Sequence, residues 1–176
     1  MKTYIYEYNW SNLENPFSYA LTGQTEDEII DELLNEPENS ESTYARVKVR
    51  GTAQTIFRKA LLKAYGSRCA FCGLSFSFAL QAAHIIPWSK ATNSQRLDVR
   101  NGLLLCATHH SLYDAGILTV SRNYSINFVA SSKHRLVTQY DNLLSSDFHN
   151  KKIKLPKKIQ HLPNPEYLDF RNSSIN

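Results

Sequence analysis

Three cysteines and a histidine are spaced as metal ligands in the middle of this chain of 176 residues. Cys69 and Cys72 are separated by two residues, and Cys106 and His109 repeat that spacing. Two short chelating pairs supply the four sulfur and nitrogen ligands of a tetrahedral zinc ion. A site with four protein ligands is closed, so we expect this zinc to stabilise the fold and to perform no chemistry. Three buried free cysteines are the alternative, because cysteine also packs as a small apolar side chain.

The order of His84, Asn101 and His110 around these pairs resembles the motif of the HNH nuclease family, over roughly residues 50–120. The resemblance implies that His84 is the general base that deprotonates water, a task that suits an imidazole with a pKa near neutrality. It also implies that Asn101 orders the loop and orients the base, and that His110 binds a catalytic Mg²⁺ or Mn²⁺ ion. Adjacent histidines on a helix point about a quarter-turn or more apart, so we expect His109 to face zinc and His110 the groove. The reverse assignment is the alternative.

The chain departs from the family at Ala83, where many members have an aspartate that binds the catalytic metal. Asp114 follows His110 by four residues, so both side chains share one face of a helix. We predict that Asp114 replaces the missing ligand, because a carboxylate is a hard ligand that suits magnesium or manganese. An Asp114 that caps a turn or pairs with an arginine is the other interpretation. Members of this type usually have a cysteine where His109 stands.

By the same resemblance the fold is α+β, with a ββα-metal (HNH or His-Me finger) core, a structural zinc, flanking helices and a β-hairpin. The residues favour the same order of elements. A β-compatible apolar run covers 80–87, a polar loop covers 89–101, and a buried strand covers 102–105 before a helix that begins at Cys106. This path brings the end of the first strand, near His84, beside the helix.

Helical patterns precede this core. Residues 25–35 place aliphatic side chains on one face and acids on the other, which predicts a helix that begins with a capping box at Thr25. Residues 37–44 are then predicted as a turn or linker. Residues 52–66 form the clearest helical pattern in the chain, and Gly66 supplies its left-handed stop.

Strand patterns and a basic segment complete the chain. Period-two alternation predicts a strand over 4–8 and a hairpin over 117–129. Lysines around a proline predict an extended basic strap over 149–161, with a solvated tail as the alternative. The end, 170–176, is predicted to fray. Three histidines without partners at ligand spacing are predicted at the surface: His134, His149 and His161.

Charge divides the chain into two parts. Residues 1–45 carry a net charge of −9 and residues 46–176 a net charge of +13. A basic excess suits a polyanionic partner such as nucleic acid, and suits a solvated surface equally well. We expect an acidic N-terminal arm over 1–45, a nuclease domain over 46–130, and a basic extension over 131–176 that packs on the core. The arm packs on the body, forms a dimer contact or covers the DNA surface, and plain packing is the preferred interpretation.

Basic side chains near the loop and in the strap are the candidate contacts to nucleic-acid phosphates. They are Lys90, Arg96, Arg100, Arg58, Lys151, Lys152 and Lys154.

The resemblance thus implies a metal-dependent endonuclease that hydrolyses DNA, double-stranded above all, in restriction or defence. A zinc-stabilised nucleic-acid-binding module without cleavage and an RNA-cleaving nuclease are the alternatives. A homodimer is a candidate assembly, because two sites cut two strands. No apolar run is long enough to span a membrane, the start lacks a secretory pattern, and the cysteines pair as metal ligands. We therefore expect a cytoplasmic protein.

Overall fold

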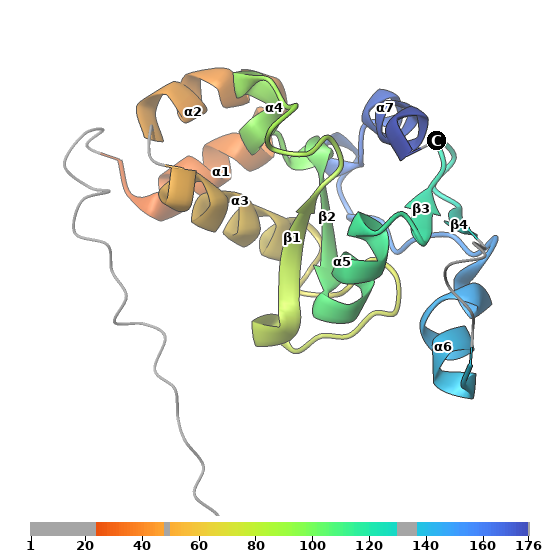
Figure 1. Cartoon of the computed structure of the whole chain (residues 1–176). Coiled ribbons are helices and arrows are strands. Elements are labelled where there is room, and N and C mark those ends of the chain that lie inside the picture. The colour runs from red at the N-terminus through yellow and green to blue at the C-terminus, as the bar shows by residue number, and fades with distance from the viewer. Residues whose placement is uncertain (1–23, 48–49, 130–136, 176) are drawn as a thin grey trace, which may run out of the picture.

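The computed structural model describes residues 24–47, 50–129 and 137–175, which form two short antiparallel hairpins among helices (Figure 1). The strands are β1 (Leu80–His84), β2 (Gly102–Cys106), β3 (Leu118–Val120) and β4 (Ile126–Phe128). The α-helices of the described part are α1 (Glu26–Asn35), α2 (Ser40–Val47), α3 (Arg50–Ala64), α4 (Asn93–Leu97), α5 (Ala107–Asp114), α6 (Gln139–Leu144) and α7 (Pro165–Ile175). This is the α+β class that the sequence predicts. None of the described helices is long and apolar enough to cross a membrane. The predicted strand over 4–8 lies outside the described residues.

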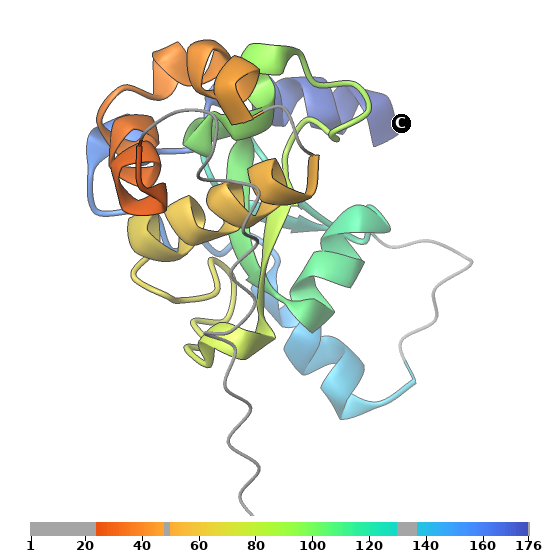
Figure 2. The same cartoon turned by 90° about the vertical axis from the view of Figure 1, so that its left-hand side faces the viewer.

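The β1–β2 hairpin stands between α3 and α5 (Figure 2). Successive side chains along a strand point to opposite faces, which explains how one strand serves both helices. His84 stacks on Phe57 of α3, with ring centroids 4.1 Å apart. Gln81 instead contacts His110 of α5. The predicted order of two strands and a helix is confirmed, and it places His84 at the open end of β1.

Gly102 lets α3 pack directly on the hairpin. It pairs with His84 in the register of β1 and β2. A Cβ atom at this position would lie 2.6 Å from Cδ1 of Leu61 and 2.8 Å from Cζ of Phe57. Only glycine leaves room for such an approach, so this position fixes how closely the ring of Phe57 covers His84.

The predicted helices at the N-terminal side are present. Thr25 and Glu28 form the expected capping box of α1. Buried aliphatic side chains of α1 pack against α3, and Lys59 of α3 pairs with Glu26 of α1 at 2.7 Å. The acidic helix α1 therefore packs against α3, and the predicted boundaries of the three domains stay predictions.

Two segments predicted as turn or loop contain helices instead. Residues 37–44 form a 3₁₀ turn (Pro37–Asn39) and most of α2, where Thr43 is buried and donates to Glu32 at 3.0 Å. The loop over 89–101 holds α4, which Thr92 caps. Serine, threonine and asparagine favour turns by themselves, but here they cap helices or bond to neighbouring elements.

The C-terminal prediction was wrong in two respects. The segment predicted to fray belongs to α7 up to Ile175, and its Arg171 is only 6% exposed. His161, predicted at the surface, is 4% exposed and its Nε2 lies 2.7 Å from the carbonyl oxygen of Leu34. His149 is exposed, as predicted, and His134 lies outside the described residues. Burial against distant elements, which local sequence does not reveal, decides both cases.

The predicted hairpin over 117–129 is present as β3 and β4, which pair in antiparallel fashion. The basic strap (149–161) is extended over most of its length. Its Lys152 forms a bridge with Ser125 beside β4. The backbone N–H of Lys154 donates to the carbonyl of Ala70 at 2.7 Å. The strap is therefore packed along the body and is not a solvated tail.

Candidate functional site

The two predicted ligand pairs meet in space. One ligand atom from each of Cys69, Cys72, Cys106 and His109 lies within 4.8 Å of every other. Sγ of Cys72 and Sγ of Cys106 are 4.0 Å apart, and Sγ of Cys69 is 3.7 Å from Nδ1 of His109. Ligands bonded to one tetrahedral zinc ion are separated by about 3.8 Å or slightly less. The cluster therefore fits a zinc ion through three sulfur atoms and Nδ1.

Electrostatics within this cluster favour a cation. The hydrogen bond from Cys106 is the main reason that the pKa of Cys69 is lowered, and the same pairing raises the pKa of Cys106. Burial lowers the pKa of His109, but its hydrogen bonds with Cys69 and Cys72 outweigh burial and raise this pKa to about 9. The negative charge of the Cys69 thiolate therefore lies where a metal ion would neutralise it.

Aromatic rings enclose the His109 side of the cluster. The ring centroids of Phe71 and Phe148 lie 5.5 Å and 5.0 Å from that of His109. Cys69 and His109 are fully buried, and Cys72 is exposed. The cluster is thus closed on its inner side, as in structural zinc sites.

His84 lies at the end of β1 with its ring held on three sides. Phe57 stacks on one face, and Trp88 meets the ring edge-on at 5.6 Å. Nε2 of His84 is 3.0 Å from the carbonyl oxygen of Arg96. A carbonyl only accepts, so Nε2 carries the proton and Nδ1 carries the lone pair.

The pKa of His84 is lowered, chiefly by burial. The charge of His110 lowers this pKa further, whereas the carbonyl of Arg96 and the charge of Asp114 raise it. His84 therefore shares one electrostatic environment with two side chains of α5, and its neutral form persists below the ordinary pKa of 6.5.

Asn101 is fully buried between β1 and α4. Its Oδ1 accepts from the N–H of Ile86 at 2.7 Å, and its Nδ2 donates to the carbonyl of Gln95 at 2.9 Å. Its backbone carbonyl accepts from the N–H of Ile85 at 2.9 Å. Asn101 thereby ties the segment that follows His84 to the loop that carries Arg96.

His110 and Asp114 lie on one face of α5, as their spacing predicts. Nε2 of His110 is 3.2 Å from Oδ2 of Asp114. Nδ1 of His110 is 2.6 Å from Oε1 of Gln81, which assigns the proton of the neutral ring to Nδ1 and the lone pair to Nε2. Neighbouring ligands of an octahedral ion are about 3.0 Å apart, so this pair of atoms fits a shared divalent cation.

Arg171 of α7 joins the ends of β1 and α5. Its Nη1 donates to the carbonyl of Ile85 at 3.3 Å, and its Nη2 donates to the carbonyl of Tyr113 at 2.7 Å. Nη2 also lies 3.5 Å from Oδ1 of Asp114. The residue after His84 and the residue before Asp114 are thus bonded to the same guanidinium. Asp114 does pair with an arginine, and its other oxygen remains beside His110.

Three of the residues predicted to contact phosphates are arginines, and their side chains form hydrogen bonds or ion pairs within the protein. Arg58 donates to two backbone carbonyls. Arg100 pairs with Asp98 at 2.9 Å, and Arg96 donates to the hydroxyl of Tyr44 at 3.0 Å. These bonds hold the helices and the loop together, which leaves fewer donors for a phosphate.

The predicted lysine contacts are all exposed. Lys152 donates to the carbonyl of Asn123 at 2.5 Å, and Lys154 to that of Phe71 at 3.4 Å. Nζ of Lys151 lies 5.6 Å from the ring centroid of Phe148. Lys90 precedes α4 and is exposed. Phosphate binding by these residues stays a prediction.

Sequence reasoning missed Gln81, Phe57 and Arg171 as residues that position the site. The alternation of β1 gives a signal for Gln81, since residues 81 and 83 must share a face. Phe57 lies within the predicted helix over 52–66, but the sequence does not connect it with His84. Nothing in the sequence near Arg171 connects it with the histidines, because the contact joins residues 58 and 86 positions apart.

Comparisons with known proteins find one family profile and a solved structure that resemble parts of this chain. Residues 69–121 match the profile of the HNH endonuclease family. A solved structure titled "Modification dependent TagI restriction endonuclease" aligns with a TM-score of 0.42 at 18% identity, over 66% of this chain and 36% of that one. The chain thus spans about a third of the length of that protein. No curated protein matches the chain.

Proposed function

We propose that this chain, whose residues 69–121 match the HNH endonuclease profile, is a metal-dependent endonuclease that hydrolyses phosphodiester bonds of DNA. The observation that supports this most is the convergence of two elements on one site. His84 from β1 responds to the charges of His110 and Asp114 from α5, and Arg171 ties the ends of both elements together. A general base and a pair of metal ligands are the groups that phosphodiester hydrolysis requires.

His84 acts as the general base through Nδ1. Its Nε2–H is held by the carbonyl of Arg96, so Nδ1 is the atom that takes a proton from the attacking water. Burial lowers its pKa, which keeps the ring neutral at pH 7 and able to accept that proton. Phe57 and Trp88 fix the plane of the ring, which limits the reorientation needed before attack.

His110 and Asp114 would hold the catalytic cation through Nε2 and Oδ2. When bound, Mg²⁺ or Mn²⁺ supplies positive charge that stabilises the pentavalent phosphorus and the leaving oxygen. Gln81 keeps the lone pair of His110 on Nε2, and Arg171 holds the other oxygen of Asp114. Outer partners of this kind orient ligands and raise metal affinity.

Asn101 positions the base and does not react. Its side chain bonds to the backbone of Ile86 and of Gln95, which are near His84 and Arg96. A zinc ion held by the cysteine cluster would fix the start of α5 to the loop over 69–73, which is a structural role. We place the protein in restriction or defence, in the cytoplasm, with double-stranded DNA as substrate and a homodimer as the form that cuts both strands.

A binding module without cleavage is the second candidate, and one observation favours it. Ala83, at the position of the family's usual metal carboxylate, is fully buried and offers no ligand. The site then depends on Asp114 for its only carboxylate near His110 among the interactions described.

A supercoiled-plasmid assay with Mg²⁺ or Mn²⁺ tests the proposal. We expect the wild type to nick or linearise the plasmid and the His84→Ala variant to lose this activity by about 10²-fold or more, the usual contribution of a general base. His149→Ala, which removes an exposed histidine outside the site, is the matched control. Single-stranded RNA is offered in parallel.

The three functions give different results in this assay. Plasmid cutting that depends on His84 and on the added metal supports the DNA nuclease. Duplex binding without cutting under any divalent metal identifies the binding module, and cutting of RNA alone identifies an RNA nuclease. Asp114→Asn is expected to raise the Mg²⁺ concentration for half-maximal cutting by at least the tenfold that loss of an outer partner costs. Asp169→Asn, whose carboxylate pairs with Arg122, is its control.

A further inference from the structure

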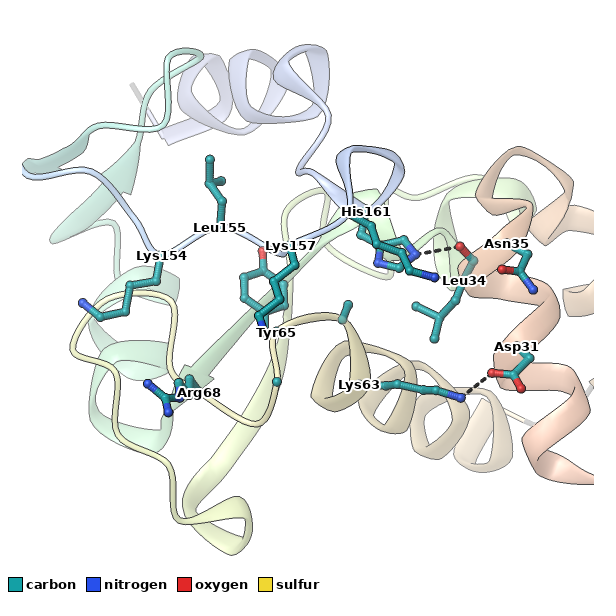
Figure 3. Close-up of a pocket in the computed structure, with 13 residues that line it drawn as sticks. Asp31, Leu34, Asn35, Lys63, Tyr65, Arg68, Lys154, Leu155, Lys157 and His161 are labelled. Atoms are coloured by element: carbon teal, nitrogen blue, oxygen red, sulfur yellow. Dashed lines mark hydrogen bonds and ion pairs between the residues drawn. The ribbon is translucent and has the colours of Figure 1, made fainter.

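A pocket that neither His84 nor His110 lines is found where the basic strap crosses α1 and the end of α3 (Figure 3). Its volume is about 710 Å³, within the range of about 300–1,000 Å³ typical of small-ligand sites. None of the residues assigned to the zinc cluster or to catalysis lines it. The pocket therefore calls for a function of its own.

Positive charge dominates the lining. Lys63, Arg68, Lys154, Lys157 and Lys158 line the pocket, and Asp31 is the one acid among its lining residues. Asp31 pairs with Lys63, so this acid is already neutralised. Within the described part of the chain, the side chains of Arg68, Lys157 and Lys158 form no ion pair or hydrogen bond.

The inner surface of the pocket is partly apolar. Leu34, Ala64, Tyr65 and Leu155 contribute to its lining. Tyr65 is buried, and its hydroxyl is already bonded to the carbonyl of Gly102 at 3.2 Å. A ligand with an anionic group and a flat apolar part meets both kinds of surface, and a nucleotide has both.

The strap is anchored at both ends of the pocket, which holds its lysines in place. At one end the N–H of Lys154 donates to the carbonyl of Ala70 at 2.7 Å, next to Cys69 of the cysteine cluster. At the other end, His161 and Gln160 bond to the carbonyl of Leu34, at 2.7 Å and 3.2 Å. Figure 3 shows Arg68 and Lys154 at one end and the Lys63–Asp31 pair and His161 at the other.

We propose that this pocket binds the phosphate group of a nucleotide unit, carried by the nucleic-acid strand or by a free nucleotide. Unpaired ammonium and guanidinium groups favour phosphate over neutral ligands, and Arg68 offers the planar fork that matches phosphate oxygens. The strand-borne source rests on the proposed function, since it makes the pocket a second contact for DNA outside the catalytic site. The free-nucleotide source makes it a separate ligand site.

Binding measurements on the full chain test this proposal. The background is His84→Ala without added divalent metal, so cleavage does not interfere. The pocket variant adds Lys157→Gln and Lys158→Gln, and the matched control adds Lys59→Gln and Arg122→Gln, two cations outside the pocket that pair with acids. Both lose two charges. The probes are a fluorescein-labelled 20-base-pair duplex, 2′-deoxyadenosine 5′-monophosphate, and deoxyadenosine without phosphate.

If the phosphate belongs to the nucleic-acid strand, the pocket variant should bind the duplex about tenfold more weakly than the His84→Ala background. The slope of log K against log salt should also fall by about two in magnitude, one for each lost contact. The control variant keeps the slope. A free nucleotide predicts saturable calorimetric binding of the monophosphate that the pocket variant loses, and none of deoxyadenosine. Either result supports the proposal and identifies the source.

Unchanged binding of both the duplex and the monophosphate in the pocket variant overturns the proposal. If that variant instead shows only a lower Tm, the lysines serve the C-terminal end of α3 electrostatically, and the proposal is again overturned. A wild type that cuts no plasmid, while its pocket binds either phosphate probe, contradicts the proposed function alone.

Discussion

His84 combines three features that a general base needs: a fixed tautomer, a fixed plane and a neutral ring. The carbonyl of Arg96 determines the tautomer, and Phe57 determines the plane. Burial lowers the pKa and so keeps the ring neutral. Each feature comes from a single contact or from burial. The lowered pKa should affect how both the cleavage rate and the free energy of unfolding depend on pH.

The rate of cleavage should depend on pH with an acid limb below pH 6.5, the ordinary value for this group. A lowered pKa means that the basic form survives to lower pH, so kcat/KM falls only as pH drops through the shifted value. Trp88→Ala removes part of the cover of the ring and should move the limb up toward pH 6.5. The measurement is the pH profile of plasmid nicking, with Tyr140→Ala, an exposed aromatic, as control.

The same shift affects stability in a defined direction. Below pH 6.5 the unfolded chain takes up a proton on this histidine before the folded chain does, so the free energy of unfolding falls as pH drops below that value. The penalty stops growing once pH is below the folded pKa. For the cleavage rate, an acid limb centred above pH 6.5 would contradict the assignment of His84 as the general base.

The two adjacent histidines are assigned to different metals: His109 to the structural zinc and His110 to the catalytic cation. We expect His109→Gln to lose zinc and unfold the domain, because a zinc site contributes about 10–16 kcal/mol in small domains and folds have about 5–15 kcal/mol in total. His110→Gln should keep its zinc and its Tm but lose cleavage, since His110 is half-buried beside Gln81 and is not a member of the cysteine cluster. Zinc content by mass spectrometry and Tm by calorimetry check both variants; the opposite pattern would reverse the two roles.

At the scale of elements, the site depends on how closely α3 packs on the hairpin. Phe57 and Leu61 of α3 occupy the space beside Gly102. The contact sets the position of His84 because Gly102 pairs with it in the β-register. Packing of a helix on two strands therefore also fixes the base.

Gly102→Ala should destabilise the protein by about 1–3 kcal/mol through overpacking, which lowers Tm by several degrees. The displaced Phe57 ring should also reduce cleavage. Gly51→Ala is the control, because a Cβ there meets nothing within 4 Å in α3 and should stabilise the helix slightly. Thermal melts and plasmid nicking are the measurements. Equal Tm values for the two variants would show that the hairpin does not need this close approach.

For the whole molecule, α7 completes the site from the far end of the chain. Arg171 stacks on the ring of Tyr113 at 3.9 Å and bonds to Ile85, Tyr113 and Asp114. It is a buried cation whose donors serve carbonyls of two elements. The extension at the C-terminus is therefore part of the site's support, beside any role of the strap.

Arg171→Lys keeps the charge but not the fork, so it should leave at least one buried carbonyl without a donor, at a cost of about 1–3 kcal/mol. Asp114 then loses its second partner, and the Mg²⁺ requirement for cleavage should rise. Arg122→Lys, at an exposed pair with Asp169, should change neither quantity. The checks are Tm and a Mg²⁺ titration of nicking; an unchanged metal requirement would confine Arg171 to a purely structural role.

The sequence alone predicted the features that depend on local spacing. The two ligand pairs, the face shared by His110 and Asp114, the helix over 52–66 and the order of strands around His84 all follow from periods of a few residues. Side-chain direction repeats with a fixed period along a helix or strand, so such features can be predicted from the sequence alone.

Only the tertiary structure decided which distant residues support the site. The segments predicted as linker (37–44), loop (89–101) and frayed end (170–176) contain most of α2, all of α4 and the second half of α7. Their polar residues cap these helices or bond to partners elsewhere in the chain. Arg171 reaches Ile85, 86 positions away, and Gln160 of the strap reaches Leu34, 126 positions away. No local period encodes such pairs; they form because packing of apolar faces brings these backbones together, and buried polar groups must then find donors and acceptors there.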